Sequence, residues 1–151
     1  MSRLHSRLKD WLIALGKANG YGAWTPDTGS DVEFSKIRNV KIDYRPDVVW
    51  KHQRTGKKVI LELAFEEDYR QIVGEVFLAS QLESFAKIYI IRPTGDEPFW
   101  RNIEKFLRLA FSNEGIIRVA HRPRFIIYKR GEKENRIKQR ILEVLTDEQW
   151  I

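Results

Sequence analysis

The segments RPDVVWK, residues 45–51, and KVILELAF, residues 58–65, decide the fold of this chain. In the second segment the odd-numbered residues are apolar, whereas the even-numbered residues are mixed and include Glu62. Such alternation indicates a β-strand with two different faces. The polar stretch at 53–57 is typical of a hairpin turn. We therefore expect two paired strands, with Asp47 at the start of the first and Glu62 within the second.

Outward from these strands, the spacing of apolar residues predicts alternating helices and strands. The glycine- and proline-containing stretch at 20–31 predicts an irregular connection. We expect helices at 4–15, 68–85, 99–110 and 137–145, and strands at 32–34, 40–44, 47–51, 58–65, 87–91, 116–120 and 124–128. A helix between the strands at 58–65 and 87–91 predicts a parallel pair with a crossover. The fold class is therefore α/β with a mixed sheet.

Composition limits the class of protein. The 151 residues are 42% hydrophobic, which is enough for a core and suits one domain over residues 1–151. The absence of Cys excludes disulfides, thiolate zinc sites and a Cys nucleophile. No apolar run is long enough for a membrane span and no secretory signal begins the chain, so we expect a cytoplasmic protein without a membrane partner. The net charge of +6 suits an anionic partner, although an ordinary charged surface explains it as well.

Asp47 and Glu62 are the candidate catalytic groups. A carboxylate within a β-strand is costly unless it is paired or bound to a cation. Two carboxylates from neighbouring strands suit Mg²⁺ or Mn²⁺ better than zinc, and a metal-bound water can attack a phosphodiester. Taken alone, each has an ordinary explanation. Asp47 follows a proline and suits a turn, and Glu62 can face solvent or pair with Lys58.

These residues resemble the PD-(D/E)xK, or restriction-endonuclease-like, nuclease superfamily, through Pro46-Asp47 followed by Glu62-Leu63-Ala64. The expected order of elements over roughly residues 3–92 matches that family's α-β-β-β-α-β core, and the rest of the chain adds an α-β-β-α extension. The resemblance implies that Asp47, Glu62 and the backbone carbonyl of Leu63 bind Mg²⁺ or Mn²⁺. It also implies a hydrolase that cuts phosphodiester bonds.

Ala64 departs from the family pattern, because it occupies the position of the motif Lys. Either another cation replaces that Lys, or the site no longer cuts. The candidate replacements are Lys9 and Arg70. Lys58 is a poor candidate, because it lies about 13 Å along the strand from Glu62.

The first helix carries a further resemblance. His5 and Lys9 form a His-x-x-x-Lys pattern similar to that of the competence-protein CoiA-like families, although a solvated helix edge gives the same pattern. Glu33 is a candidate fourth metal ligand or, alternatively, an exposed strand carboxylate.

Basic residues cluster near the last two strands. Arg122, Arg124, Lys129 and Arg130 form a candidate nucleic-acid surface, with DNA favoured over RNA, or an ordinary charged face. We expect a metal-dependent nuclease. The alternatives are a non-catalytic nucleic-acid-binding module on the same fold, and an assembly subunit whose apolar helix faces form a homodimer.

Overall fold

Five strands form the main sheet, in the spatial order β1-β4-β5-β6-β9. The structure is a computed structural model that describes residues 3–26, 32–42, 44–65, 68–93 and 97–151. The main strands are β1 (Tyr21–Trp24), β4 (Val48–His52), β5 (Lys58–Phe65), β6 (Ala86–Arg92) and β9 (Arg124–Ile127). The helices are α1 (Arg3–Ala18), α2 (Val32–Ser35), α3 (Tyr69–Ser80), α4 (Glu97–Ala110) and α5 (Glu134–Asp147). Two further pairs of short strands are β2 (Lys36–Ile37) with β3 (Val40–Lys41), and β7 (Phe111–Ser112) with β8 (Ile117–Arg118).

The hairpin and the crossover predicted from the sequence are confirmed. β4 and β5 pair antiparallel with Val48 opposite Leu61, and the polar turn lies between them. β5 and β6 pair parallel through α3, with Glu62 opposite Tyr89, and β9 extends the parallel part of the sheet. The sheet is therefore mixed and flanked by helices, as expected.

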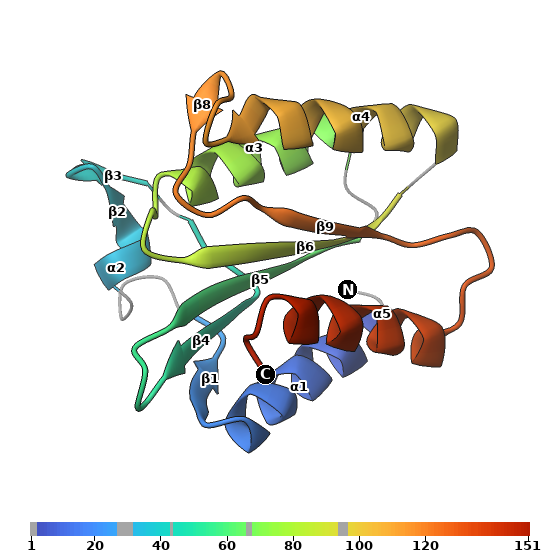
Figure 1. Cartoon of the computed structure of the whole chain (residues 1–151), viewed down its shortest axis with the longest axis horizontal. Coiled ribbons are helices and arrows are strands. Elements are labelled where there is room, and N and C mark those ends of the chain that lie inside the picture. Colours follow the sequence, from blue (N-terminus) through green and yellow to red (C-terminus); the bar gives the residue numbers. More distant parts are fainter. Residues whose placement is uncertain (1–2, 27–31, 43, 66–67, 94–96) are drawn as a thin grey trace.

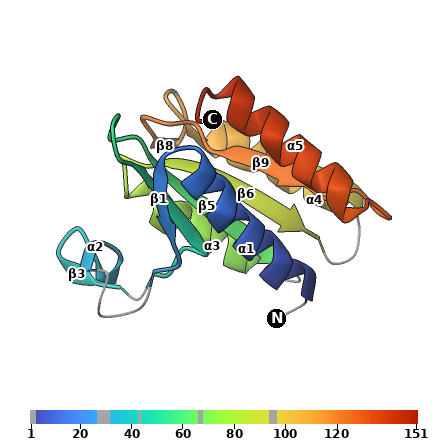
Figure 2. The ribbon, with the colours of Figure 1, turned by 90° about the horizontal axis from the view of Figure 1, so that it is seen from below.

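Helices cover both faces of the sheet and enclose two cores (Figure 1). The odd-numbered residues of β5 face α1 and α5, and Leu8, Leu12 and Ile141 pack on that side. The even-numbered residues face α3 and α4. Figure 2 shows α1 and α5 crossing the same face of the sheet. Glu62 therefore points from β5 towards the α3–α4 layer.

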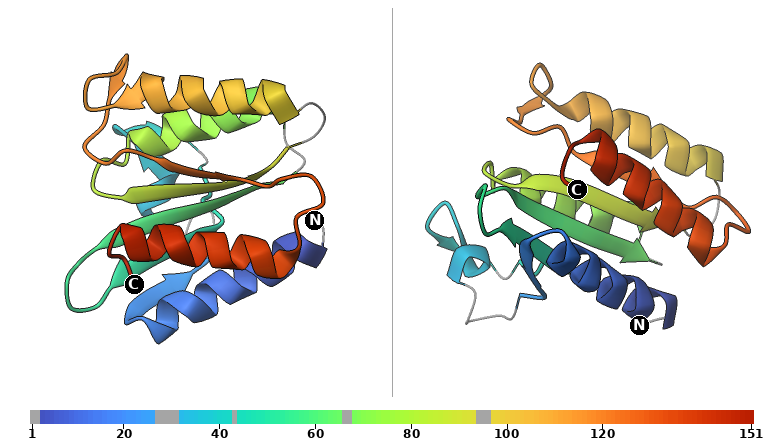
Figure 3. Two further views of the ribbon diagram at one scale, coloured as in Figure 1. Left: turned by 45° about the vertical axis from the view of Figure 1, so that its right-hand side comes forward. Right: turned by 60° about the horizontal axis from the view of Figure 1, so that its bottom comes forward.

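Within the described part of the chain, the four long helices α1, α3, α4 and α5 all begin at the same end of the molecule. β5, β6 and β9 run parallel and finish there, and we call this end the carboxyl edge. α3 and α4 each begin after one of these strands, and α1 and α5 also start at this end (Figures 1 and 3). An ion pair of 2.7 Å between Arg7 and Glu134 joins the second turn of α1 to the first residue of α5. Because β4 runs opposite to β5, Asp47 also lies at this edge, immediately before β4.

Three local predictions are wrong. The irregular connection expected at 20–31 contains the edge strand β1, which pairs with β4 from Tyr21 opposite His52 onward; residues 27–31 lie outside the described part of the chain. The strand expected at 32–34 is the short helix α2. The strand expected at 40–44 contributes only β3, which pairs with β2 and not with the main sheet, and Asp43 is not described. β1 therefore supplies the third strand of the antiparallel group.

Several element boundaries also differ. The helix expected at 68–85 ends at Ser80, and β8 is two residues long and belongs to a separate ladder with β7. Among the described helices, none is long and apolar enough to cross a membrane.

Candidate functional site

The side chains of Asp47 and Glu62 are interlocked through the backbone. Asp47 lies one register step beyond the last β4–β5 pair, which places it opposite Glu62. The N–H of Asp47 donates to Glu62 Oε1 at 2.9 Å, and the N–H of Leu63 donates to Asp47 Oδ2 at 2.8 Å. The two carboxylates therefore continue the hydrogen-bond ladder with side-chain oxygens and lie next to each other.

The two carboxylates differ in their access to solvent. Glu62 is 3% exposed, whereas the side chain of Asp47 is 25% exposed. Pro46 is buried immediately before Asp47 and fixes the chain direction there. Any ion or water that reaches the pair would approach from the side of Asp47.

Two buried tyrosines surround Glu62. The hydroxyl of Tyr44 donates to Glu62 Oε1 at 3.5 Å, a long contact, and Tyr89 lies opposite Glu62 on β6. Burial raises the pKa of both phenols well above the usual value, and the negative charges of Glu62 and Glu75 raise it further. Both tyrosines therefore stay protonated and can act as hydrogen-bond donors beside a carboxylate.

Helix α1 brings positive charge to Asp47. His5 Nε2 is 3.6 Å from Asp47 Oδ1, and Lys9 follows one turn later on the same helix. Burial raises the pKa of Asp47, and the hydrogen bond from the Leu63 N–H and the charges of His5 and Lys9 partly oppose that effect. The charges on this helix therefore favour the ionised form of Asp47 against the larger effect of burial.

The position of the missing motif Lys is closed. Ala64 is 1% exposed and packs in the core between the sheet and α3–α4, so it offers no route for a cation. Of the two replacements expected from the sequence, the charge of Lys9 acts on Asp47, whereas Arg70 is exposed and lies 5.7 Å above the ring of Tyr69. The structure thus brings Lys9 into the site and places Arg70 on an aromatic ring at the start of α3.

Glu33 is held elsewhere. Its carboxylate lies 2.6 Å from Lys51 Nζ and 3.8 Å from Lys58 Nζ. Lys51 and Lys58 are paired at the hairpin end of β4 and β5, and Lys58 is four residues from Glu62. The structure therefore places Glu33 in an ion-pair cluster at the opposite end of these strands from Asp47.

The donors around Asp47 fit a hard divalent cation in type. They are two carboxylates and the Leu63 carbonyl, all oxygens, which suits Mg²⁺ or Mn²⁺ and not a softer metal. Within the described ranges, no group of three or more His, Cys, Asp or Glu side chains is arranged to hold a metal ion. Among the described residues, a cation here would have Asp47 and Glu62 as its side-chain ligands.

β9 separates the four basic residues predicted to bind nucleic acid. Lys129 and Arg130 are exposed just beyond the end of β9, at the carboxyl edge. Arg122 and Arg124 lie at the start of β9, where they line a cavity of about 540 Å³ together with Arg108. The four residues therefore do not form one surface.

The charge of Arg124 is already paired in that cavity. Its Nη1 contacts Asp147 Oδ2 at 3.0 Å and also Glu148, both at the end of α5. A phosphate at this end would have to compete with two carboxylates.

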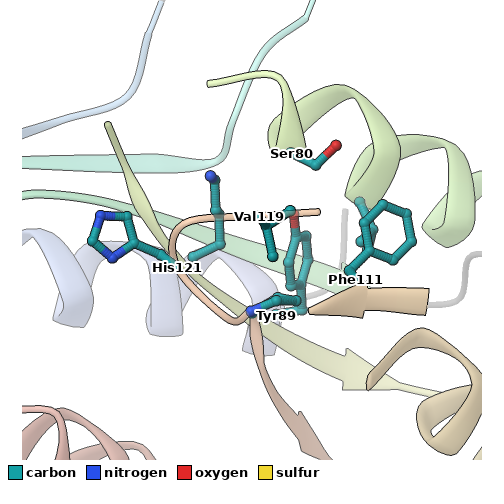
Figure 4. A pocket seen from close by; sticks show the side chains of 8 residues that line it. Ser80, Tyr89, Phe111, Val119 and His121 are labelled. Carbon is teal, nitrogen blue, oxygen red and sulfur yellow. The ribbon is translucent and has the colours of Figure 1, made fainter. Parts of the chain in front are cut away.

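A second, smaller pocket lies behind Tyr89, between α3, β6 and the segment 111–123 (Figure 4). Ser80, Tyr89, Phe111, Val119 and His121 line it, and its volume of about 10 Å³ has room for about one water molecule. The pocket is therefore a packing defect and not a substrate site.

Lys87 also lines this pocket, and its amine is buried. Nζ donates to the carbonyl oxygen of Leu82 at 2.8 Å, in the turn after α3. Burial lowers the pKa of Lys87 to about 8, and Glu83 partly opposes the change. The hydrogen bond of this amine therefore closes the turn after α3, and the buried positive charge on Lys87 costs the folded protein free energy.

Sequence reasoning missed the two tyrosines and the role of Glu75. Tyr89 could have been found by aligning the two parallel strands, since that register puts it opposite Glu62. Tyr44 ends the alternating segment at 40–44, but no sequence signal places it beside Glu62. Gln71 and Glu75 have the spacing of a surface pair. In the structure Gln71 forms a capping box with Asp68, and the negative charge of Glu75 raises the pKa of Tyr44 and Tyr89.

Comparison with known protein families, with curated proteins and with solved structures finds no match to this chain.

Proposed function

We propose that the chain is a metal-dependent nuclease of the PD-(D/E)xK type, in which Asp47, Glu62 and the Leu63 carbonyl hold Mg²⁺ or Mn²⁺. The observation that carries the proposal is the reciprocal pair of hydrogen bonds between these two strands, which fixes two carboxylates side by side. The order α1-β1-β4-β5-α3-β6 supports it, because the three antiparallel strands, the crossover helix and the parallel strand follow in the order of that family's core.

In this proposal each residue of the site has a separate role. Asp47 and Glu62 bind the cation, which when bound would lower the pKa of a coordinated water and offset charge on the phosphate. Lys9 replaces the motif Lys, from α1 instead of β5, and its charge favours the ionised form of Asp47. Tyr44 donates its hydroxyl to Glu62, and the protonated Tyr89 lies opposite Glu62 on β6.

The decisive experiment is a cleavage assay on labelled single- and double-stranded DNA and RNA, with Mg²⁺, with Mn²⁺ and with EDTA. We expect metal-dependent cutting that Asp47→Asn and Glu62→Gln each reduce by at least about 100-fold, and that Lys9→Met reduces by about 10²-fold or more. Glu143→Gln, an exposed carboxylate on α5, is the matched control and should cut like the natural chain. Cutting that survives both Asp47→Asn and Glu62→Gln would refute this site.

The buried Ala64 favours a second candidate, a nucleic-acid-binding module on the same fold that no longer cuts. That function predicts no cleavage in any metal, with binding in EDTA that weakens as salt rises and is unchanged by Glu62→Gln. The same substrate panel therefore separates the two functions.

A further inference from the structure

Large hydrophobic side chains are exposed mainly on one layer of the molecule. Within the described residues, six of the seven large exposed apolar side chains belong to α3, α4 and the segment leading into β8. They are Tyr69, Phe77, Phe99, Phe106, Leu109 and Ile116. Four of the six are aromatic, which an ordinary charged surface does not explain.

Two of these rings meet at the carboxyl edge. Tyr69 is the first residue of α3 and Phe99 is the third residue of α4, and their ring centroids are 5.4 Å apart at an interplanar angle of 78°. They are 37% and 43% exposed, so neither ring is buried by the other. The Arg70 guanidinium lies 5.7 Å from the centre of the Tyr69 ring. Arg70, Tyr69 and Phe99 thus form a cationic aromatic cluster, which we call the aromatic platform.

The platform lies on the same side of the sheet as the buried carboxylate. Glu62 points from β5 towards the α3–α4 layer, and α3 begins four residues after β5 ends. The platform and the Asp47–Glu62 pair therefore share the carboxyl edge of the sheet, where the more exposed Asp47 also contacts His5 of α1. A chain of nucleotides that lay along this edge could contact both the platform and Asp47.

We propose that the aromatic platform stacks the unpaired bases of a single-stranded nucleic acid, which makes single strands or splayed ends the substrate class of the proposed nuclease. This inference rests on the proposed function for its biological meaning. Two partly exposed aromatic rings next to a guanidinium match an unpaired base next to its phosphate, since every base has a π-face and every linkage a negative charge. A duplex hides its base faces within the stack and offers the platform only phosphates.

The test is equilibrium binding by fluorescence anisotropy, in EDTA, with a labelled single strand and the blunt duplex of the same sequence. Because no cleavage is needed, the result does not depend on whether the Asp47–Glu62 pair is catalytic. We expect Tyr69→Leu and Phe99→Leu each to weaken single-strand binding by about 5- to 100-fold and to leave duplex binding nearly unchanged. Leucine keeps an apolar side chain and removes the π-face; at position 69 it also removes the tyrosine hydroxyl, whereas Phe99→Leu removes the ring alone.

Phe106→Leu is the matched control. Phe106 is also an exposed phenylalanine of α4, about 10 Å further along the helix from Phe99, and its replacement should leave both affinities unchanged. Thermal unfolding of each variant verifies that it folds. Arg70→Gln is an independent variant that leaves both rings in place. It should weaken single-strand binding and reduce the log–log salt slope by about 0.7.

Three results would overturn the inference. The first is single-strand binding equal to that of the natural chain in all three platform variants. The second is an equal loss for single strand and duplex. The third is binding to phosphatidylserine vesicles that requires the two rings while single-strand binding does not, which would assign the platform to a membrane surface. If the platform variants behave as expected but no metal supports cleavage, the proposed nuclease fails and the binding surface remains.

Discussion

Burial raises the pKa of Asp47, so the ionised carboxylate costs the folded protein free energy. The folded state holds this proton to a higher pH than the unfolded state does, and stability therefore falls as pH rises through the folded pKa. Above the folded pKa the full cost is present. Asn at this position keeps an oxygen that can accept from the Leu63 N–H but carries no charge.

We therefore expect Asp47→Asn to raise the urea midpoint of the metal-free protein at pH 7 while cleavage is lost. Glu33→Gln is the comparison, because it removes surface ion pairs with Lys51 and Lys58 and should cost about 0–1 kcal/mol. A lower urea midpoint for Asp47→Asn would show that the attraction of His5 and Lys9 for the Asp47 carboxylate exceeds the cost of burying its charge. Higher stability with lost activity is the expected signature of a functional residue.

Lys87 gives stability a different dependence on pH. Its pKa falls from 10.5 to about 8 on folding, so between these values the unfolded state binds more protons and stability rises with pH. Below pH 8 the full penalty is present. Above pH 10 the raised pKa values of Tyr44 and Tyr89 act in the opposite direction, since the unfolded state loses those protons first.

Lys87→Met isolates this effect in urea unfolding between pH 7 and pH 10. We expect the variant to lose a stability increase of up to about 3 kcal/mol that the natural chain shows over that range. The hydrogen bond to Leu82 is lost at every pH, so only the change with pH reports the buried charge. Parallel curves for the two proteins would contradict the assignment.

At the scale of elements, α1 packs closely against Trp50 of β4, and Gly16 makes this close approach possible. Trp50 Nε1 donates to the carbonyl oxygen of Leu12 at 3.0 Å, and a Cβ on Gly16 would lie 2.5 Å from the same nitrogen. A methyl group there must push α1 away from the sheet. Since α1 carries His5 and Lys9, the site depends on this contact.

Two glycine-to-alanine variants test this packing by thermal unfolding. Gly16→Ala should destabilise by about 1–3 kcal/mol and weaken cleavage, because α1 shifts. Gly74→Ala, in α3 with nothing within 4 Å of the added Cβ, should stabilise by about 0.5–1 kcal/mol. Equal effects of the two substitutions would show that α1 is not held by Trp50.

The elements that could be predicted from the sequence are those whose patterns extend over many residues. The alternation of β5 and the change of period at α3 determine the hairpin, the crossover and the position of Glu62. β1 could not be predicted, because a four-residue strand containing Gly22 is defined by its pairing with β4 and not by its own composition. α2 fails for the same reason, since three residues fit either a helix or a strand.

The candidate site could be predicted only where it follows the strands. Asp47 and Glu62 come from the register, whereas Tyr44 and Glu75 reach the surroundings of Glu62 through tertiary packing. The choice between Lys9 and Arg70 also needs the fold, because helix periodicity does not say which charge lies beside Asp47.

At the scale of the whole molecule, the two ends of β9 make different predictions for nucleic-acid binding. Lys129 and Arg130 lie at the carboxyl edge with the Asp47–Glu62 pair, whereas Arg122 lies at the far end beside carboxylates that already pair with Arg124. We expect nucleic acid to lie across the carboxyl edge.

Salt-dependent binding of a labelled single strand measures this directly. The double variant Lys129→Gln, Arg130→Gln should weaken binding and reduce the log–log salt slope by about 1.4, for two lost phosphate contacts. Arg122→Gln should leave the slope unchanged. A larger effect of Arg122→Gln would move the nucleic acid to the cavity at the start of β9.

The four long helices that begin at the carboxyl edge have a consequence beyond any side chain. Each helix start carries about half a positive charge from its aligned peptide dipoles. Four such helix starts at one end give this end a partial positive charge that comes from the backbone. No substitution of Lys or Arg removes this charge, and it does not titrate with pH. Variants that lack the basic side chains at this edge should therefore still attract anions weakly, because the direction of the four helices follows from the topology of the chain.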